Sequence, residues 1–157
     1  KKARFVIVGS GNDLYTRKVV EFEKEHPDSV HGILEFNEAK AHLTYAGGDI
    51  LLMPSLFEPC GLSQMIAFAY GTIPVARATG GLADTVIDAD GSPDGTGFLF
   101  KDFASGELHK AIERALAAKE DGKRWDGIIR NAMGADFSWD NSAKAYAELY
   151  RDILTSD

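Results

Sequence analysis

The sequence predicts an α/β fold with a doubly wound, Rossmann-like parallel sheet. Short apolar runs alternate along the chain with segments of helical periodicity, an order that is typical of right-handed βαβ units. The clearest of these runs carry no polar face, as is usual for parallel strands that helices cover on both sides. The 157 residues, with 45% hydrophobic and 26% charged side chains, also suit one globular domain.

The first half of the chain contains three strand candidates and two helix candidates. The strands are expected at residues 5–8, 31–36 and 49–54, and the helices at 14–25 and 37–45. His26-Pro27 ends the first helix. Asn37 is the expected N-cap of the second helix, which Gly47-Gly48 closes.

The second half is expected to add two strands and four helices. An apolar helix at 61–70 precedes strands at 72–76 and 97–100, and three more helices follow at 104–120, 123–134 and 139–154. A glycine-rich turn at 78–81 and a surface loop at 88–97 lie between the two strands. Ser138 or Asp140 lies near the start of the last helix. These elements predict one domain, 1–157, with its C-terminal helix in 139–157.

The composition excludes some classes of protein. The net charge of −7 and the pI near 5.1 argue against a nucleic-acid-binding protein. They do not argue against a small phosphate-bearing ligand, because helix N-termini bind anions without basic side chains. A single cysteine, Cys60, precludes an intramolecular disulfide and favours a reducing compartment. No apolar run approaches the roughly 20 residues that span a bilayer, so no membrane interaction is expected.

Four segments lie at the carboxyl ends of expected strands, where open parallel sheets bind ligands. They are residues 9–11, 36–37, 55–62 and 79–81. We therefore expect residues that are far apart in the sequence to converge on one site. No acidic pair has the spacing of two-carboxylate hydrolysis, and the four histidines show no metal-ligand spacing.

Gly9 and Gly11 begin a dinucleotide-binding fingerprint that the sequence does not complete. The G-x-G-x-x-G spacing requires a third glycine at position 14, which is Leu14. This disfavours a nicotinamide enzyme. The two glycines either contact a phosphate or permit a tight strand-to-helix turn, and the sequence leaves both open.

Glu58 stands between the clearest strand and the apolar helix. The amides of Cys60, Gly61 and Leu62, at the expected helix start, would point into the crevice, where an anion can lie. A carboxylate beside them can hydrogen-bond a sugar hydroxyl or stabilise an oxocarbenium-like centre. It can equally cap the helix electrostatically, and spacing alone does not decide between these roles.

Three further candidates rest on residue type alone. The segment Thr79-Gly80-Gly81 either offers amides to a second part of the ligand or forms a turn with positive φ. Phe36 either stacks on a base or packs in the core. Cys60 has no histidine in its local sequence that would make it a nucleophile.

The chain also contains two uninterrupted eight-residue motifs, F-E-P-C-G-L-S-Q at 57–64 and T-G-G-L-A-D-T-V at 79–86. Shorter matches extend from V-G-S-G at 8–11 to F-S-W at 137–139. In this order the motifs resemble the glycogen/starch synthase family of glycosyltransferases. The resemblance implies the C-terminal, donor-binding lobe of a two-lobed GT-B fold, with no cofactor and no essential metal.

The resemblance also implies a reaction and a set of site residues. The reaction is a retaining transfer of glucose from ADP-glucose or UDP-glucose to an α-1,4-glucan. Glu58 matches the family's glutamate beside the transferred sugar. The other matched positions lie on the donor: Phe36 on the base, Ser55 close by, Cys60, Gly61 and Leu62 on the sugar and phosphates, Thr79, Gly80 and Gly81 at a second phosphate-side turn, and Gly9 and Gly11 at the first glycine turn.

Two features depart from related enzymes. Ile66 stands where many related retaining transferases have a second glutamate, which favours the glycogen/starch synthase branch. No residues before Phe5 match the family's first strand and its R-L-x-x-Q-K-G-like cationic loop, and neither Arg4 nor Arg77 fits that motif. We therefore expect a fragment without the acceptor-binding lobe, inactive alone, that forms homodimers through an exposed sheet edge. The resemblance places it in a bacterial cytoplasm or a plant plastid.

Two alternatives belong to other classes of protein. One is a nucleotide-sugar-binding or scaffolding module without transferase activity, which binding without turnover would favour. The other is a redox Rossmann domain, which NAD binding would favour.

Overall fold

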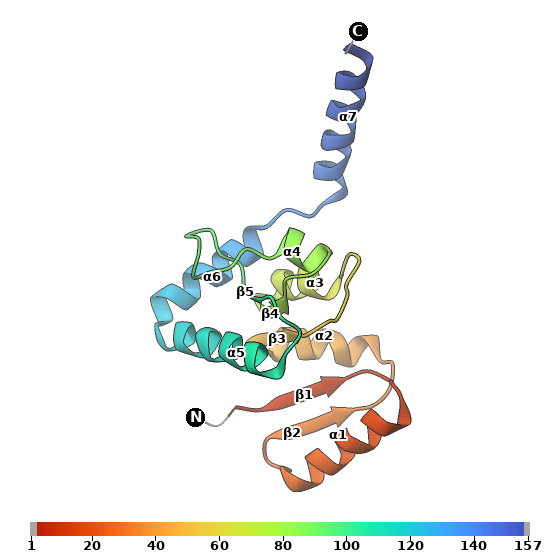
Figure 1. The fold of residues 1–157 in the computed structure, drawn as a ribbon, viewed down its shortest axis with the longest axis vertical. Coiled ribbons are helices and arrows are strands. Elements are labelled where there is room, and N and C mark those ends of the chain that lie inside the picture. Colours follow the sequence, from red (N-terminus) through yellow and green to blue (C-terminus); the bar gives the residue numbers. More distant parts are fainter. Residues whose placement is uncertain (1–2, 156–157) are drawn as a thin grey trace. The chain divides into compact units, whose positions relative to one another are not determined.

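The computed structural model describes residues 3–155 of the chain, so expectations for residues 1–2 and 156–157 lie outside the described part. Strands and helices alternate as far as residue 100, three helices follow, and the strand pairs are parallel (Figure 1). The α/β class that the sequence predicts is therefore confirmed. The strands form two sheets, and the chain forms two compact units, the first ending at Gly48 and the second beginning at Asp49.

The first unit is a parallel strand pair with two helices. Its elements are β1 (Phe5–Val8), α1 (Asp13–Glu25), β2 (Val30–Ile33) and α2 (Glu38–Gly47). The ladder runs from the pair Phe5–Val30 to the pair Val8–Ile33, and the Gly9 amide extends it with a hydrogen bond to the Ile33 carbonyl oxygen. Strand β2 ends three residues earlier than the expected strand at 31–36, because its partner ends at Val8.

Side-chain caps fix the helix starts of this unit. The Asn12 side chain accepts a hydrogen bond from the Leu14 amide at 2.8 Å and begins α1. Asn37 accepts from the Lys40 amide at 2.9 Å and begins α2, as the sequence predicts. Both asparagines follow a strand, so the chain turns into each helix directly beyond the carboxyl end of the sheet.

The second unit is a three-stranded parallel sheet with five helices among its described residues. Its elements are β3 (Ile50–Met53), α3 (Ser63–Tyr70), β4 (Ile73–Arg77), α4 (Gly81–Thr85), β5 (Phe98–Phe100), α5 (Ser105–Glu120), α6 (Gly122–Gly134) and α7 (Trp139–Thr155). The strand order is β3-β4-β5, so β4 is the central strand. Its residues from Ile73 to Ala76 are fully buried.

The core of the second unit lies on both faces of this sheet. On one face, Val75 and Phe98 pack with side chains from α3, α5 and α6. Helix α5 contributes a stripe of alanines at 111, 115 and 118, whose small side chains let the helix approach the strands closely. On the other face, Leu82 of α4 packs against Met53 and Ala76. The loops after β3 and β4 lie at the carboxyl ends of these parallel strands, between the two faces.

Two details near these loops differ from the sequence-based expectation. Helix α3 begins at Ser63 rather than at residue 61, because Gly61 has φ +77°, which a right-handed helix excludes. The glycine-rich turn continues into the short helix α4, which the sequence analysis does not predict. Burial of Leu82 explains this helix, since it places that side chain under the sheet.

The surface loop after α4 is held by charge pairs. Arg114 of α5 pairs with Asp88 at 3.2 Å and with Asp90 at 2.8 Å. Arg124 of α6 also pairs with Asp90, and Asn131 donates hydrogen bonds to two loop carbonyl groups. The polar loop that the sequence predicts at 88–97 is thus fastened to two helices.

Helix α7 has no buried residue among its described positions. The segment before it is anchored by Phe137, whose ring stacks on Phe68 with centroids 6.0 Å apart. Ser138 accepts a hydrogen bond from the Asn141 amide and marks the helix start, as expected. None of the helices within residues 3–155 combines the length and apolarity needed to cross a bilayer.

Candidate functional site

The candidate residues of the first unit lie beyond the carboxyl ends of β1 and β2. Gly9 directly follows β1 with φ +147°, and Gly11 precedes the cap of α1. Phe36 follows β2 and is 90% exposed, so it is not a core residue within its unit. The alternative of core packing is therefore excluded for Phe36 within this unit, while its role in stacking stays a prediction.

The remaining candidates lie in the second unit, on the loops after β3 and β4. Ser55 follows β3, and Thr79 follows β4, so parallel pairing brings both to the same edge of the sheet. The loop after β3 continues through Glu58 to Leu62, and the loop after β4 runs into Gly80 and Gly81. These candidates converge within this unit. Their convergence with those of the first unit stays a prediction.

The two loops are joined backbone to backbone. The Gly81 amide donates a hydrogen bond to the Glu58 carbonyl oxygen at 3.0 Å. At Gly80 the backbone has φ +46°, and a Cβ there would overlap the same carbonyl oxygen. A side chain at position 80 would therefore be strained and would push the loops apart. The glycines of the second motif are explained by close approach to the first.

Glu58 itself is half-buried, and its carboxylate forms no hydrogen bond or ion pair within residues 3–155. The electrostatic-cap alternative places it at the start of α3. That helix begins at Ser63 with Leu62 as N-cap, five residues beyond Glu58, and no side-chain cap bond forms there. A direct capping bond is thus excluded, and the carboxylate is available to another group.

The amides of Cys60, Gly61 and Leu62 form no hydrogen bond to described residues. They precede α3 rather than lying in its first turn, which corrects the expected helix start. Three successive free N–H groups beside a helix N-terminus favour a bound anion. The Leu62 side chain is 66% exposed, and the Cys60 thiol is also exposed and free.

The Arg77 guanidinium does not stand free to pair with an anion bound at these amides, because it donates hydrogen bonds to backbone carbonyl groups. The acceptors are the carbonyl oxygens of Leu56 at 2.6 Å and Lys101 at 3.0 Å. The group also lies over the Phe103 ring, 5.7 Å from its centroid. Arg77 therefore ties the loop after β3 to the segment after β5, a positioning role that residue type alone did not reveal.

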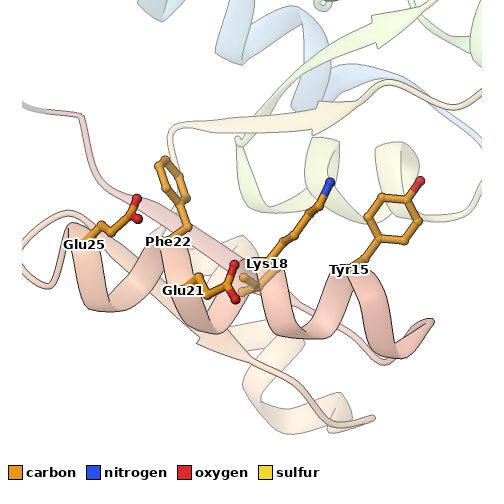
Figure 2. A pocket seen from close by; sticks show the side chains of 6 residues that line it. Tyr15, Lys18, Glu21, Phe22 and Glu25 are labelled. Carbon is orange, nitrogen blue, oxygen red and sulfur yellow. The ribbon is translucent and has the colours of Figure 1, made fainter.

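The first unit carries a hollow on its helix α1. It is an open groove of about 390 Å³ along one side of α1, lined by six residues of that helix alone (Figure 2). Figure 2 shows Tyr15 and Phe22 projecting from the helix with Lys18 between them. The groove contains none of the candidate site residues, and successive turns of a single helix do not enclose a ligand.

No group of three or more His, Cys, Asp or Glu side chains within residues 3–155 is arranged to hold a metal ion. The candidate residues on the loops after β3 and β4 offer backbone amides, the carboxylate of Glu58 and the hydroxyls of Ser55 and Thr79. Such groups bind phosphates and sugar hydroxyls.

Comparison with known families identifies the chain. The profile of "Glycosyl transferases group 1" matches residues 1–132, which include every candidate site residue. The chain belongs to this family. Its motifs at 57–64 and 79–86 are the two loops that meet through Glu58 and Gly81.

Members of this glycosyl transferase family among curated proteins resemble the chain over nearly its full length. Glycogen synthase of Thermodesulfovibrio yellowstonii is 47% identical over 150 residues, covering 96% of this chain and 29% of the relative. Glycogen synthase 2 of Geobacter sulfurreducens is 48% identical over 149 residues, covering 94% and 31%. The chain thus spans less than a third of the length of these relatives.

Two solved structures show the same fold. The catalytic domain of starch synthase IV from Arabidopsis thaliana, bound to ADP and acarbose, has a TM-score of 0.84 and 39% identity, and the match covers 95% of this chain and 32% of that one. Sucrose-phosphate synthase from Thermosynechococcus elongatus has a TM-score of 0.66 and 27% identity over 97% of this chain and 39% of that one. The GT-B fold expected from the sequence is confirmed.

Two polar residues beside the glycosyl transferase loops were not among the sequence-based candidates. Gln64 is fully buried and donates hydrogen bonds to the Cys60 carbonyl oxygen and to the Thr85 hydroxyl, both at 3.1 Å. Both residues lie within the two eight-residue motifs. A glutamine on an otherwise apolar helix was the signal that could have found the first of them.

Proposed function

We propose that this chain is the donor-binding part of a retaining glucosyltransferase that transfers glucose from ADP-glucose or UDP-glucose to an α-1,4-glucan. One observation carries the proposal: the loop after β3 presents three successive free amides, at residues 60–62, two residues after Glu58, whose carboxylate is unpaired within residues 3–155. The proposal is supported by relatives named glycogen synthase and by a similar starch synthase structure with ADP bound.

The two parts of a nucleotide sugar suit the two kinds of group. The diphosphate carries negative charge, which the amides of Cys60, Gly61 and Leu62 stabilise by hydrogen bonds without a basic side chain. We assign the Glu58 carboxylate to the transferred glucose, where it accepts a hydroxyl hydrogen bond or stabilises positive charge that develops at the anomeric carbon. Ser55 and Thr79, on the same two loops, are assigned to polar contacts with the donor.

The base of the donor is assigned to Phe36. Its ring is almost fully exposed, and a nucleobase offers an apolar face of matching size. Stacking accepts adenine and uracil alike, so the proposal covers both donors. Gly9 and Gly11, whose added Cβ atoms would meet open space, are assigned to the turn that lets the donor approach the backbone.

Binding and turnover test this proposal separately. ADP-glucose and UDP-glucose are titrated calorimetrically into this chain and into the longest natural protein that contains it. That protein is then assayed for glucose incorporation into glycogen, with Glu58→Ala beside it. We expect turnover that falls at least a hundredfold in the variant, as for loss of a group that stabilises charge in the transition state.

The same experiment separates the second candidate function. A module that binds nucleotide sugar without catalysis would give binding in both proteins and no glucose incorporation in either. Binding of NAD in place of a nucleotide sugar would indicate a redox domain. Turnover that survives Glu58→Ala unchanged would refute the role assigned to Glu58.

Two further proposals concern partners and location. We assign the glucan acceptor to parts of the relatives that this chain does not cover, since the chain spans about 30% of their length. Strand β1 is apolar, and its residues Phe5, Val6 and Ile7 are 37–48% exposed. Within residues 3–155 it pairs only with β2, which supports homodimerisation through its free edge. Light scattering tests it, and a monodisperse monomer contradicts it. Because the similar glycogen synthases are bacterial, we expect a cytoplasmic location.

A further inference from the structure

Gln64 is the most deeply buried polar side chain near the two loops. It is 0% exposed on helix α3, whose neighbouring buried residues are Ala67 and Phe68. Its carboxamide nitrogen donates to the Cys60 carbonyl oxygen and to the Thr85 hydroxyl oxygen, each at 3.1 Å. The Cys60 carbonyl can only accept, so the nitrogen and not the oxygen of the carboxamide faces it.

These bonds close a ring that runs through both loops. The Thr85 hydroxyl, which accepts from Gln64, itself donates a hydrogen bond to the Gly81 carbonyl oxygen at 2.6 Å. The Gly81 amide in turn donates to the Glu58 carbonyl oxygen at 3.0 Å. From Glu58 the backbone returns through Pro59 to Cys60. One buried side chain thus connects the start of α3, the loop after β3 and the short helix α4.

The other end of the same carboxamide carries a cost. Gln64 Oε1 is buried and has no hydrogen-bond partner among the described residues. A buried unpaired acceptor is unfavourable for folding, and an apolar side chain of similar length would avoid it. Stability alone therefore does not explain a glutamine at this position.

Gly61 fits against this oxygen. A Cβ at position 61 would lie 2.5 Å from Gln64 Oε1 and 2.9 Å from Nε2, and the backbone there has φ +77°. Gly61 and Gln64 therefore interlock, and the glutamine limits the conformations of the segment that carries the free amides of residues 60–62. The ring of hydrogen bonds and this contact act on the same three residues.

We propose that Gln64 is a positioning residue, which holds the amides of residues 60–62 and the backbone of Glu58 in one geometry for the nucleotide-sugar donor. The identity of the ligand rests on the proposed function. The hold that Gln64 has on the loop does not, because its hydrogen bonds form without ligand. Gln64 touches no reacting group, since it acts through Cys60 and through Thr85.

The first arm of the test needs no ligand. Hydrogen exchange of the Gly81 amide is measured by NMR in the unsubstituted chain and in Gln64→Met, which keeps the length of the side chain and removes its donor. Ile128→Val, in the core away from both loops, is the control for lost stability. At equal free energy of unfolding, we expect exchange about tenfold faster in Gln64→Met than in Ile128→Val, the factor that corresponds to loss of one or two hydrogen bonds.

Thr85 supplies a second variant in case Gln64→Met does not fold. Thr85→Val removes the hydroxyl and should also speed Gly81 exchange, whereas Thr85→Ser keeps the hydroxyl and should restore the original rate. In the double variant Gln64→Met/Thr85→Val, the acceleration of Gly81 exchange, expressed as a free energy, should be smaller than the sum of the two single-variant effects. Both substitutions open the same ring of hydrogen bonds. Gly81 exchange in Gln64→Met equal to that in Ile128→Val overturns the proposal, as does equal exchange in Thr85→Ser and Thr85→Val.

The second arm adds ADP-glucose as the probe. Gln64→Met and Thr85→Val should weaken its binding about tenfold, while Thr85→Ser and Ile128→Val should bind like the unsubstituted chain. Unchanged affinity in Gln64→Met overturns the link to the donor. If no variant and not even the unsubstituted chain binds ADP-glucose, the donor-binding function of this chain fails, and the exchange arm still decides whether Gln64 positions the loops.

Discussion

The Cα of Gly81 lies against the carbonyl oxygen of Cys60, so closely that a Cβ at position 81 would overlap it. The Gly81 amide also donates a hydrogen bond to the carbonyl oxygen of Glu58, which precedes Cys60 by two residues. Gly81 is therefore wedged between two residues of the motif at 57–64. The contact links the two longest motifs of the sequence.

Substitution of Gly81 by alanine should destabilise the second unit. The added methyl group meets backbone atoms of Cys60 that cannot rotate away, so one loop must move. We expect the free energy of unfolding to fall by about 1–3 kcal/mol, measured by urea titration. Gly127→Ala is the matched control, because a Cβ there meets no atom within 4 Å and the residue lies inside α6. The control should be stabilised by about 0.5–1 kcal/mol. A loss as large in Gly127→Ala would contradict the steric explanation.

Substitution of Phe36 by alanine should weaken nucleotide binding without changing stability. The ring is 90% exposed within its unit, so its removal costs little packing, while stacking on a base contributes about 1–3 kcal/mol. The expected change is a rise in the dissociation constant for ADP of roughly 5- to 150-fold, with the urea midpoint unchanged. Phe57→Ala removes another exposed ring as a control. Equal loss in both variants would count against specific stacking by Phe36.

Asp88 should make the protein sensitive to acid. Partial burial by itself raises the pKa of its carboxyl, but hydrogen bonds from the amides of Leu99 and Asp90 and the pairing with Arg114 outweigh it, and the pKa lies below its ordinary value. Because the pKa is lower in the folded state, the stabilisation is complete above the unfolded pKa of about 3.9 and is lost as the pH falls through the folded-state pKa.

The variant Asp88→Asn measures this contribution. It should lower the free energy of unfolding at pH 7 by about 1.5–3 kcal/mol, since hydrogen bonds to a charged group are lost. Below the folded-state pKa the variant and the original chain should converge. Urea titrations at pH 7, 5, 4 and 3 follow the difference, with the exposed Asp126→Asn as control. A difference that stays constant down to pH 3 would show that charge is not the cause.

Substitution of Arg77 by glutamine should loosen the loop after β3. The guanidinium holds the Leu56 carbonyl group at 2.6 Å, and the side chains of Leu56 and Phe57 are 66% and 70% exposed. Chymotrypsin should therefore cleave after one of these two residues about fivefold faster or more, the factor for losing roughly 1 kcal/mol of hydrogen bonding. Arg130→Gln removes the same charge from the surface of α6. Equal cleavage rates in the two variants would argue against the tie through Arg77.

Much of the secondary structure follows from local sequence patterns. The apolar run at β3 and the alanine stripe of α5 predict a covered strand and a helix that packs closely, and both are found. Asn37 was predicted as a cap from residue type, because an asparagine side chain satisfies helix amides within its own turn. Such interactions connect residues a few positions apart, so the sequence displays them directly.

Other features depend on contacts between distant segments. The start of α3 moved to Ser63 because Gly61 has positive φ, and the sequence could not show which glycine would take that conformation. Arg77 does not fit the cationic motif by its sequence, and the structure shows its guanidinium donating to the backbone carbonyl groups of Ser55, Leu56 and Lys101. A side chain's partners are set by where the strands place it, and charge or residue type does not encode that placement.

The Gly81–Cys60 contact separates the two kinds of information. The sequence by itself determined that two eight-residue motifs, each containing glycine, follow strands of a parallel sheet and that Glu58 lies in one of them. The tertiary structure decided that these motifs touch through their backbones, and that Gln64 and Thr85 close the ring between them. The reason is physical: periodicity and capping act along the chain, whereas a glycine required by close approach has its cause in another segment.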